Sequence, residues 1–260
     1  MLTRPDRLLW ISGLVFLALF AATLLVAAFD KRVLDGVPIW AKPLKFQLSL
    51  AVHLVTLGII AAHLSPPVQA SRLLAWTAAA CLACSLFEIA YIMLQAARVQ
   101  PSHFNVSSPL YATLYKLMAA GAVVITCTAA VVGVLALWDD GARLSRPVRH
   151  GVVLGLVAGS VLTLVAGFTI GSRMSHAVGE AAADAARMPL TGWSLSVGDL
   201  RIPHFLATHM MQSVPLAGVL AAMLLPPLAA TAAVWIFAGG WTLATYYSYT
   251  WALAGGPLLR

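Results

Sequence analysis

Seven long apolar runs, separated by short polar or proline-rich breaks, follow one another along the chain. A membrane-spanning helix needs about 20 mostly apolar residues, and each run has about that length or more. The runs are Leu8–Phe29, Phe46–Leu64, Leu73–Ala97, Leu110–Trp138, Gly151–Gly171, His204–Leu225 and Leu228–Leu253. The breaks include Asp139-Asp140-Gly141 and Pro226-Pro227, whose prolines and glycine end helices. The pattern predicts an all-α fold, a polytopic transmembrane bundle of seven helices that occupies residues 1–260 as a single domain.

The composition supports a membrane protein and excludes several other classes. Of the 260 residues, 61% are hydrophobic and 10% are charged, whereas a soluble domain is nearer half apolar and a quarter charged. The mean hydropathy is +0.89. The net charge of +7 comes from 16 basic and 9 acidic residues, and it reflects scarce acids more than a basic patch. We therefore expect a multi-pass protein in contact with the lipid bilayer, with no nucleic-acid partner.

Basic residues predict which terminus faces the cytoplasm. Arg143, Arg146 and Arg149 form the densest basic cluster, in the short loop between the fourth and fifth spans. Because short cytoplasmic loops are rich in Lys and Arg, this loop favours a cytoplasmic N-terminus and an exported C-terminus. A tally over the whole chain opposes that orientation, since most of the remaining basic residues fall on the other side.

Small residues recur every four positions in the fifth predicted span. They are Gly151, Gly155, Gly159, Thr163, Gly167 and Gly171. Side chains of this size let a second helix approach closely. We therefore expect this span to be buried against another helix, and a second copy of the chain is a candidate partner for such packing. The first span is polar only at Ser12 and Thr23, which favours a place at the lipid-facing periphery.

Polar side chains inside the other spans indicate a cavity. Ionisable groups in a bilayer are costly and face the bundle interior or a wet cavity. Lys45 and His53 lie on one face of the second span, Glu88 lies in the third, and His204 and His209 begin the sixth. Because chain direction alternates, all of these groups belong to the same half of the bilayer, within about 13 Å of one surface. The pattern predicts one polar cavity that opens to one membrane face.

The candidate site residues have three predicted roles. Glu88 is the candidate catalytic residue, because a lone carboxyl group in a span is costly enough to indicate a function. The candidate metal ligands are four histidines, His53, His103, His204 and His209. The candidate ligand-binding residues are polar groups near the same surface, Lys42, Lys45, Arg98, Asn105, His176, Arg201 and Gln212. Some have a simpler structural interpretation as well: the lysines can extend to lipid phosphates, and Asp199 can cap the sixth helix.

The segment 172–203 is long for a connection within a compact bundle. We expect it to lie outside the membrane, where it is a candidate lid over the polar cavity. Residues 176–187 are rich in alanine and predict a short surface helix. Trp193, Leu195 and Leu200 offer apolar anchors for the rest of the loop.

Three motifs together resemble a bacterial family of integral membrane proteins that we know only as uncharacterised. They are W-x-K-P-x-K-F at residues 40–46, S-H-F-N at residues 102–105, and G-D-x-R-x-P-H-F-x3-H at residues 198–209. The resemblance covers most of the chain. It implies seven spans and a place in the bacterial inner membrane, and it implies no particular activity.

A second similarity is to zinc-dependent membrane hydrolases of the ceramidase and adiponectin-receptor kind. It rests on the seven spans, on Ser49-x3-His53 and on paired histidines near a late span. The sequence departs from that pattern, because His204 and His209 are five apart where the pattern has H-x3-H, and they begin the sixth span rather than the seventh. The third span also contains no Asp.

Three functions remain open at this point, and the residues leave undecided whether the protein is an enzyme. In the first, histidines from different spans bind haem b or a transition-metal ion, with a redox or related enzymatic role. In the second, Lys42, Lys45, Arg98 and Arg201 bind a small anion or a lipid headgroup in a transporter or binding protein, and Glu88 takes up a proton. In the third, the histidines are hydrogen-bond partners inside a structural subunit.

Overall fold

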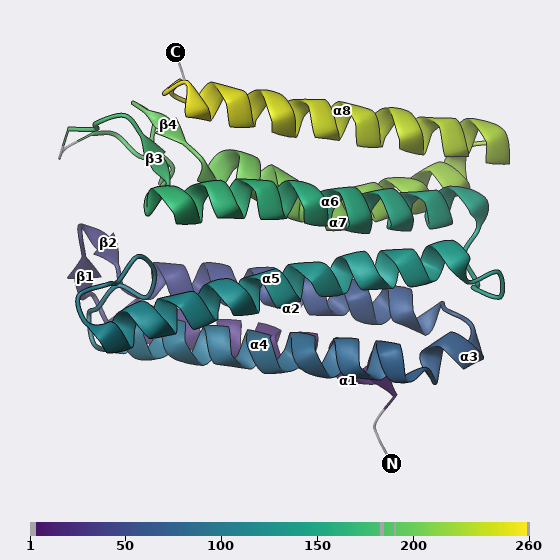
Figure 1. Cartoon of the computed structure of the whole chain (residues 1–260), viewed down its shortest axis with the longest axis horizontal. Coiled ribbons are helices and arrows are strands. Elements are labelled where there is room, and N and C mark those ends of the chain that lie inside the picture. The colour runs from purple at the N-terminus through teal and green to yellow at the C-terminus, as the bar shows by residue number, and fades with distance from the viewer. Residues whose placement is uncertain (1–3, 183–184, 190, 259–260) are drawn as a thin grey trace. The chain divides into compact units, whose positions relative to one another are not determined.

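The computed structural model describes residues 4–182, 185–189 and 191–258 and divides the chain into two compact units, residues 1–144 and 145–260. The all-α prediction is confirmed, because seven helices of the described chain are long and apolar enough to cross a membrane (Figure 1). Unit 1 contains α1 (Pro5–Phe29), α2 (Ala41–Ala62), the short α3 (Pro66–Gln69), α4 (Arg72–Ala97) and α5 (Pro109–Trp138). Unit 2 contains α6 (Arg146–Arg173), α7 (Arg201–Leu224) and α8 (Pro227–Leu253). That both units form a single domain remains a prediction.

The helices begin before the apolar runs that predicted them. Several start with a proline in the first turn, where its missing N–H is not needed. At α5, the side chain of Ser108 accepts a hydrogen bond from the backbone N–H of Tyr111 over 3.3 Å, which satisfies one of the exposed donors of the first turn. The largest differences are at α2, which begins at Ala41, and at α6, which begins at Arg146. Lys42 and Lys45 therefore lie on the first turns of α2.

In unit 1, α1 and α2 cross where each helix carries a glycine. A Cβ atom built on Gly58 would lie 2.7 Å from the backbone N of Trp10, and one on Gly13 would lie 2.6 Å from a side chain of α2. Real Cβ atoms do not approach so closely, and the crossing therefore requires glycine at both positions. Elsewhere along this pair, the side-chain amide of Gln47 donates to Thr23 Oγ1 over 2.8 Å. Many apolar side chains of α1 remain exposed within unit 1.

A short hairpin joins α1 to α2 at one end of unit 1 (Figure 1). It pairs β1 (Val33–Leu34) with β2 (Val37–Pro38) in antiparallel register. Asp30 accepts hydrogen bonds from the indole of Trp40 and from the guanidinium of Arg32. Arg32 also donates to the carbonyl oxygen of Ala97 at the end of α4 over 2.9 Å. These contacts bring the start of α2 and the end of α4 to the same end of the unit.

In unit 2, the glycine face of α6 packs on α7, which confirms the close packing predicted for this span. A Cβ atom on Gly151 would lie 2.8 Å from the carbonyl oxygen of Val214, and one on Gly155 would lie 2.6 Å from the ring of Pro215. Gly151, Gly155 and Gly159 are all buried. On the other side of α7, Trp241 of α8 donates to the carbonyl oxygen of Leu206 over 2.7 Å. The partner of the glycine face is thus a helix of the same unit.

The connection from α6 to α7 is not helical where the structure describes it, and the short surface helix predicted for 176–187 is wrong there. Instead, β3 (Ala177–Val178) pairs antiparallel with β4 (Gly198–Asp199). The local alanine content favours a helix, but pairing with a distant segment overrides that preference. Gly198 packs so closely on the carbonyl oxygen of Ala252 in α8 that no side chain fits there. Residues 183 and 184 lie outside the described chain.

The glycine packing in unit 2 makes a prediction that a matched pair of variants can test. Gly151→Ala places a methyl group against backbone, and we expect it to lower the free energy of unfolding by about 1–3 kcal/mol. The control is Gly239→Ala in α8, where a Cβ atom meets nothing within 4 Å. It should be neutral or stabilising by up to about 1 kcal/mol, because alanine favours helix. Denaturation of both variants in detergent measures the difference, and equal effects would contradict the packing.

Candidate functional site

Unit 1 brings together three ionisable side chains from three segments, Lys42 on α2, Glu88 on α4 and His103 in the loop before α5. We call these three residues the Lys42 cluster. The ammonium group of Lys42 lies 6.0 Å from the centroid of the Phe46 ring, and that ring meets the imidazole of His103 edge-on at 5.5 Å between centroids. The positive charge of Lys42 acts on both Glu88 and His103. The start of α2 and the end of α4 lie at the same end of unit 1; that their polar groups line one cavity remains a prediction.

Aromatic side chains surround His103. Its ring centroid lies 6.3 Å from that of Tyr115 on α5 and 6.4 Å from that of Phe104. Phe104 and Tyr115 also meet edge-on, at 5.7 Å. Apolar surroundings of this kind exclude water and strengthen the electrostatic interactions of the groups inside them. The aromatic rings therefore give the Lys42 cluster a less polar environment than its position near a helix end would suggest.

Glu88 is the group of the cluster that is most costly to bury, because its carboxyl group lies within a span. The residue is only 3% exposed. Its Oε1 atom has no hydrogen-bond partner among the described residues, and it faces Gly121 of α5, where a Cβ atom would lie 3.2 Å away. The absence of a side chain at Gly121 lets α5 pack closely on the carboxyl oxygen. A buried acceptor without a protein partner calls for a water, an ion or a ligand.

The loop 98–108 holds His103 in place through its own hydrogen bonds. The side chain of Asn105 donates to the carbonyl oxygen of Pro101 over 3.1 Å and accepts from the hydroxyl group of Ser107 over 2.7 Å. Gln95 at the end of α4 donates to the same carbonyl oxygen over 3.3 Å. Asn105 is buried, and its contacts are those of a residue that shapes the loop. Phe104 has a positive φ of 58°, an uncommon conformation for a side chain of this size.

Burial lowers the pKa of His103 well below its ordinary value, and the nearby positive charge of Lys42 lowers it further. His103 is therefore neutral at physiological pH, with one ring nitrogen as a donor and the other as an acceptor. Ser102 Oγ lies 3.2 Å from the Nδ1 atom of this ring. A neutral imidazole beside a lysine can donate to a ligand without adding a second positive charge to the cluster.

The remaining predicted site residues of unit 1 have different environments. His53 is buried in the middle of α2. Lys45 and Arg98 are exposed at the end of the unit that carries the Lys42 cluster, and Arg98 follows the last residue of α4. Sequence reasoning missed Gln47, which is fully buried and has an Oε1 atom without a hydrogen-bond partner in the described chain. An amide between the apolar residues Phe46 and Leu48 was the available signal in span two.

In unit 2, His204 and His209 lie on different faces of α7. His204 faces α6, where its ring lies 3.7 Å from the position of a Cβ atom on Gly167. Its buried Nδ1 atom has no hydrogen-bond partner among the described residues. The His209 ring lies 4.3 Å from the Phe205 ring, and its Nδ1 atom lies 3.2 Å from Gln212 Oε1. When Nδ1–H donates to this oxygen, the lone pair of His209 is on Nε2.

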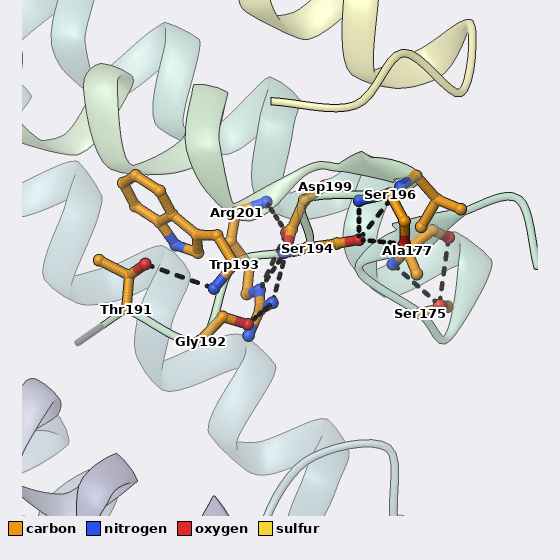
Figure 2. A network of polar contacts seen from close by, with 10 residues as sticks. Ser175, Ala177, Thr191, Gly192, Trp193, Ser194, Ser196, Asp199 and Arg201 are labelled. Carbon is orange, nitrogen blue, oxygen red and sulfur yellow. Dashed lines mark hydrogen bonds and ion pairs between the residues drawn. The ribbon is translucent and has the colours of Figure 1, made fainter. Parts of the chain in front are cut away.

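The loop of unit 2 is held by a network centred on Asp199, which Figure 2 shows. Asp199 accepts hydrogen bonds from the backbone N–H of Ser194 over 2.9 Å and from the guanidinium of Arg201, which also donates to the carbonyl oxygen of Gly192. Burial raises the pKa of Asp199, but the hydrogen bonds and charge of Arg201 outweigh it and hold the pKa below its ordinary value. Arg201 is thus engaged in shaping the loop. His176 contributes its carbonyl oxygen, which accepts from Leu200 N–H over 2.8 Å.

The predicted metal ligands are distributed over both units, with His53 and His103 in unit 1 and His204 and His209 in unit 2. In the part of the chain that the structure describes, no three His, Cys, Asp or Glu side chains gather closely enough to hold a metal ion. Whether histidines of the two units share a site remains a prediction.

Comparisons with models of protein families, with curated proteins and with solved structures find no match.

The neutral state of His103 predicts an effect of pH on stability. The unfolded chain protonates this imidazole near pH 6.5, whereas the folded protein binds the proton only at lower pH. The free energy of unfolding should therefore fall as the pH is lowered below about 6.5. His103→Gln should reduce this acid sensitivity, and the exposed His63 changed to Gln should not. Thermal denaturation between pH 5 and pH 8 measures the slopes; an unchanged slope in His103→Gln would show that this residue is not the cause.

Proposed function

We propose that this multi-pass membrane protein binds a small anion at the Lys42 cluster and that the anion binds together with a proton. The seven apolar helices support a membrane protein, and the resemblance seen in the sequence motifs favours the bacterial inner membrane. The observation that carries the proposal is the buried carboxyl group of Glu88, which has an unpartnered oxygen and lies within the field of Lys42.

The charges of Lys42 and Glu88 explain why a proton would accompany the anion. With Glu88 ionised, the two side chains are together neutral, and an added anion would leave a buried negative charge, which is costly. With Glu88 protonated, the two side chains together carry one positive charge, which a bound anion can neutralise. Each ligand therefore favours binding of the other, and the coupling is reciprocal by thermodynamic linkage. The same arrangement serves a binding protein or a proton-coupled transporter.

The other groups of the cluster have supporting roles in this proposal. Neutral His103 can donate one hydrogen bond to the anion, and Phe46 and Tyr115 provide aromatic surfaces beside it. Lys45 and Arg98, which are exposed near the same end of unit 1, attract anions toward the site by their charge. Planar carboxylates match these aromatic surfaces better than spherical ions do.

Titration of the detergent-purified protein with benzoate, acetate, phosphate and chloride at pH 6 and pH 8 tests the proposal. We expect tighter binding of at least one anion at pH 6. Glu88→Gln should make its affinity independent of pH, since the neutral amide mimics the protonated carboxyl group. Lys42→Gln should weaken binding about tenfold or more, the cost of a hydrogen bond to a charged group. Lys116→Gln, which removes an exposed lysine of α5, is the control and should leave binding unchanged. Anion binding whose pH dependence survives in Glu88→Gln would contradict the proposed coupling.

A second candidate function is binding of haem b or a transition-metal ion by the histidines, with a redox role. The observation that favours it is the contact between His209 Nδ1 and Gln212. Histidines that bind metals through Nε2 commonly donate their other N–H group to an acceptor, which fixes the ring. His204 offers a second candidate ring nitrogen, because its buried Nδ1 atom has no hydrogen-bond partner among the described residues.

An absorption spectrum and elemental metal analysis of the purified protein separate the two candidates. If the second is right, the protein carries a haem band or a stoichiometric metal. His209→Ala should then lose the bound haem or metal. His63→Ala, which changes the residue after the end of α2, should keep it. Protein that stays colourless and metal-free after incubation with haem, iron, copper and zinc would rule out the second candidate and leave the first untouched.

A further inference from the structure

The end of unit 1 opposite the Lys42 cluster contains two adjoining hollows beside the start of α1. The first, of about 290 Å³, is lined by Asp6, Arg7, Trp10, Gly58, Ile59, Ala62 and His63. The second, of about 400 Å³, is lined by Arg4, Arg7, Leu8, Ile11 and Ser12. Arg7 borders both. We call the first hollow the α1–α2 groove.

The groove exists because α1 and α2 approach so closely at Gly58. A Cβ atom there would press on the backbone of Trp10, at 2.7 Å from its N atom. The absence of a side chain lets the helices meet at this point, and Gly58 itself lines the groove together with Ile59 and Ala62. The shape is therefore built by the crossing itself.

The rim of the groove is positively charged. Its one carboxyl group belongs to Asp6, which is buried and forms an ion pair of 3.1 Å with Arg4. Arg7 is exposed, and no acidic side chain of the described chain pairs with it. Nearby, the guanidinium of Arg143 donates to the carbonyl oxygen of Ala62 over 2.7 Å. Among the residues that line the two hollows, Arg4 and Arg7 are cationic and Asp6 is the one acid, which leaves one positive charge for a phosphate group.

Below this rim the surface is apolar. Ile11 is 54% exposed and Ile59 is 48% exposed, and both line a hollow that Arg7 borders. Trp10, whose side chain is also exposed, has the amphipathic indole that favours the headgroup region of a bilayer. His63 contributes an imidazole whose Nδ1 atom bonds the carbonyl oxygen of Ile59 over 2.9 Å. A cationic rim above an apolar wall has the chemical pattern of a phospholipid, with its headgroup outside and its acyl chains inside.

We infer that the α1–α2 groove binds an anionic glycerophospholipid, with the phosphate held by Arg7 and an acyl chain lying against Ile59 and Gly58. Guanidinium is the side-chain group best matched to phosphate oxygens. The site is independent of the proposed anion site, because about 20 residues of α2, roughly 30 Å of helix, separate Lys42 from Ala62. The bound lipid would stabilise the α1–α2 crossing as a ligand that binds only the folded state.

The test compares lipids and variants on delipidated protein in detergent. Phosphatidylglycerol should raise the Tm of the wild-type protein, with saturation that gives an apparent Kd. Phosphatidylcholine with the same acyl chains should act much more weakly, and inorganic phosphate alone should have little effect. Arg7→Gln should weaken phosphatidylglycerol binding about tenfold. Arg72→Gln, an exposed arginine at the start of α4 outside the groove lining, is the matched control and should bind normally.

A second variant keeps the inference falsifiable if Arg7→Gln folds poorly. Ala62→Phe fills the groove but leaves its cations in place, and it should lose phosphatidylglycerol binding as well. Glu88→Gln should retain lipid binding, which separates this site from the Lys42 cluster. Normal lipid binding by both Arg7→Gln and Ala62→Phe would overturn the inference. Equal shifts with phosphatidylcholine would also overturn it, and so would inorganic phosphate reproducing the full effect, which would indicate a site for free anions.

Discussion

In lipid, no hydrophobic force drives one apolar helix against another, and helices associate where small residues let their backbones meet. Both units of this protein are organised by that constraint. In unit 1, Gly13 and Gly58 hold α1 against α2; in unit 2, Gly151 and Gly155 hold α6 against α7. The polar features depend on these crossings, since the first creates the groove beside Arg7 and the second sets His204 against α6.

The two ends of unit 1 each contain a buried acidic side chain, and the basic residues around it differ. At one end, Glu88 is buried within a span, and the charge of Lys42 offsets only part of the cost of burying its carboxylate. At the other, Asp6 is compensated by Arg4, and the excess charge of Arg7 remains at the surface, where lipid phosphates are available. The first arrangement suits a small anion that binds together with a proton. The second suits a component of the membrane itself.

The loops show why local sequence patterns were insufficient outside the helices. Residues 176–187 have the composition of a helix, yet Ala177 pairs with Asp199 and Val178 with Gly198, which lie far along the chain. Asn105, a candidate ligand-binding residue, holds the loop 98–108 through Pro101 and Ser107. In the first case the partner strand is distant in the sequence, and in the second the hydrogen bonds lie within an irregular loop. Neither arrangement produces a periodic pattern in the sequence.

Sequence alone determined the number of long apolar helices, their approximate ends and the close packing of the fifth of them, because hydrophobic length and glycine spacing are local properties that a bilayer converts directly into structure. It also identified Glu88, His103 and Lys42 as polar groups near one end. Only the tertiary structure decided which of them meet, since the direction of a side chain depends on the neighbouring helix that it contacts. His204 and His209 are five residues apart in the sequence, yet they face different surroundings, because a helix turns by about 100° at each residue and its neighbours cover only some of its faces.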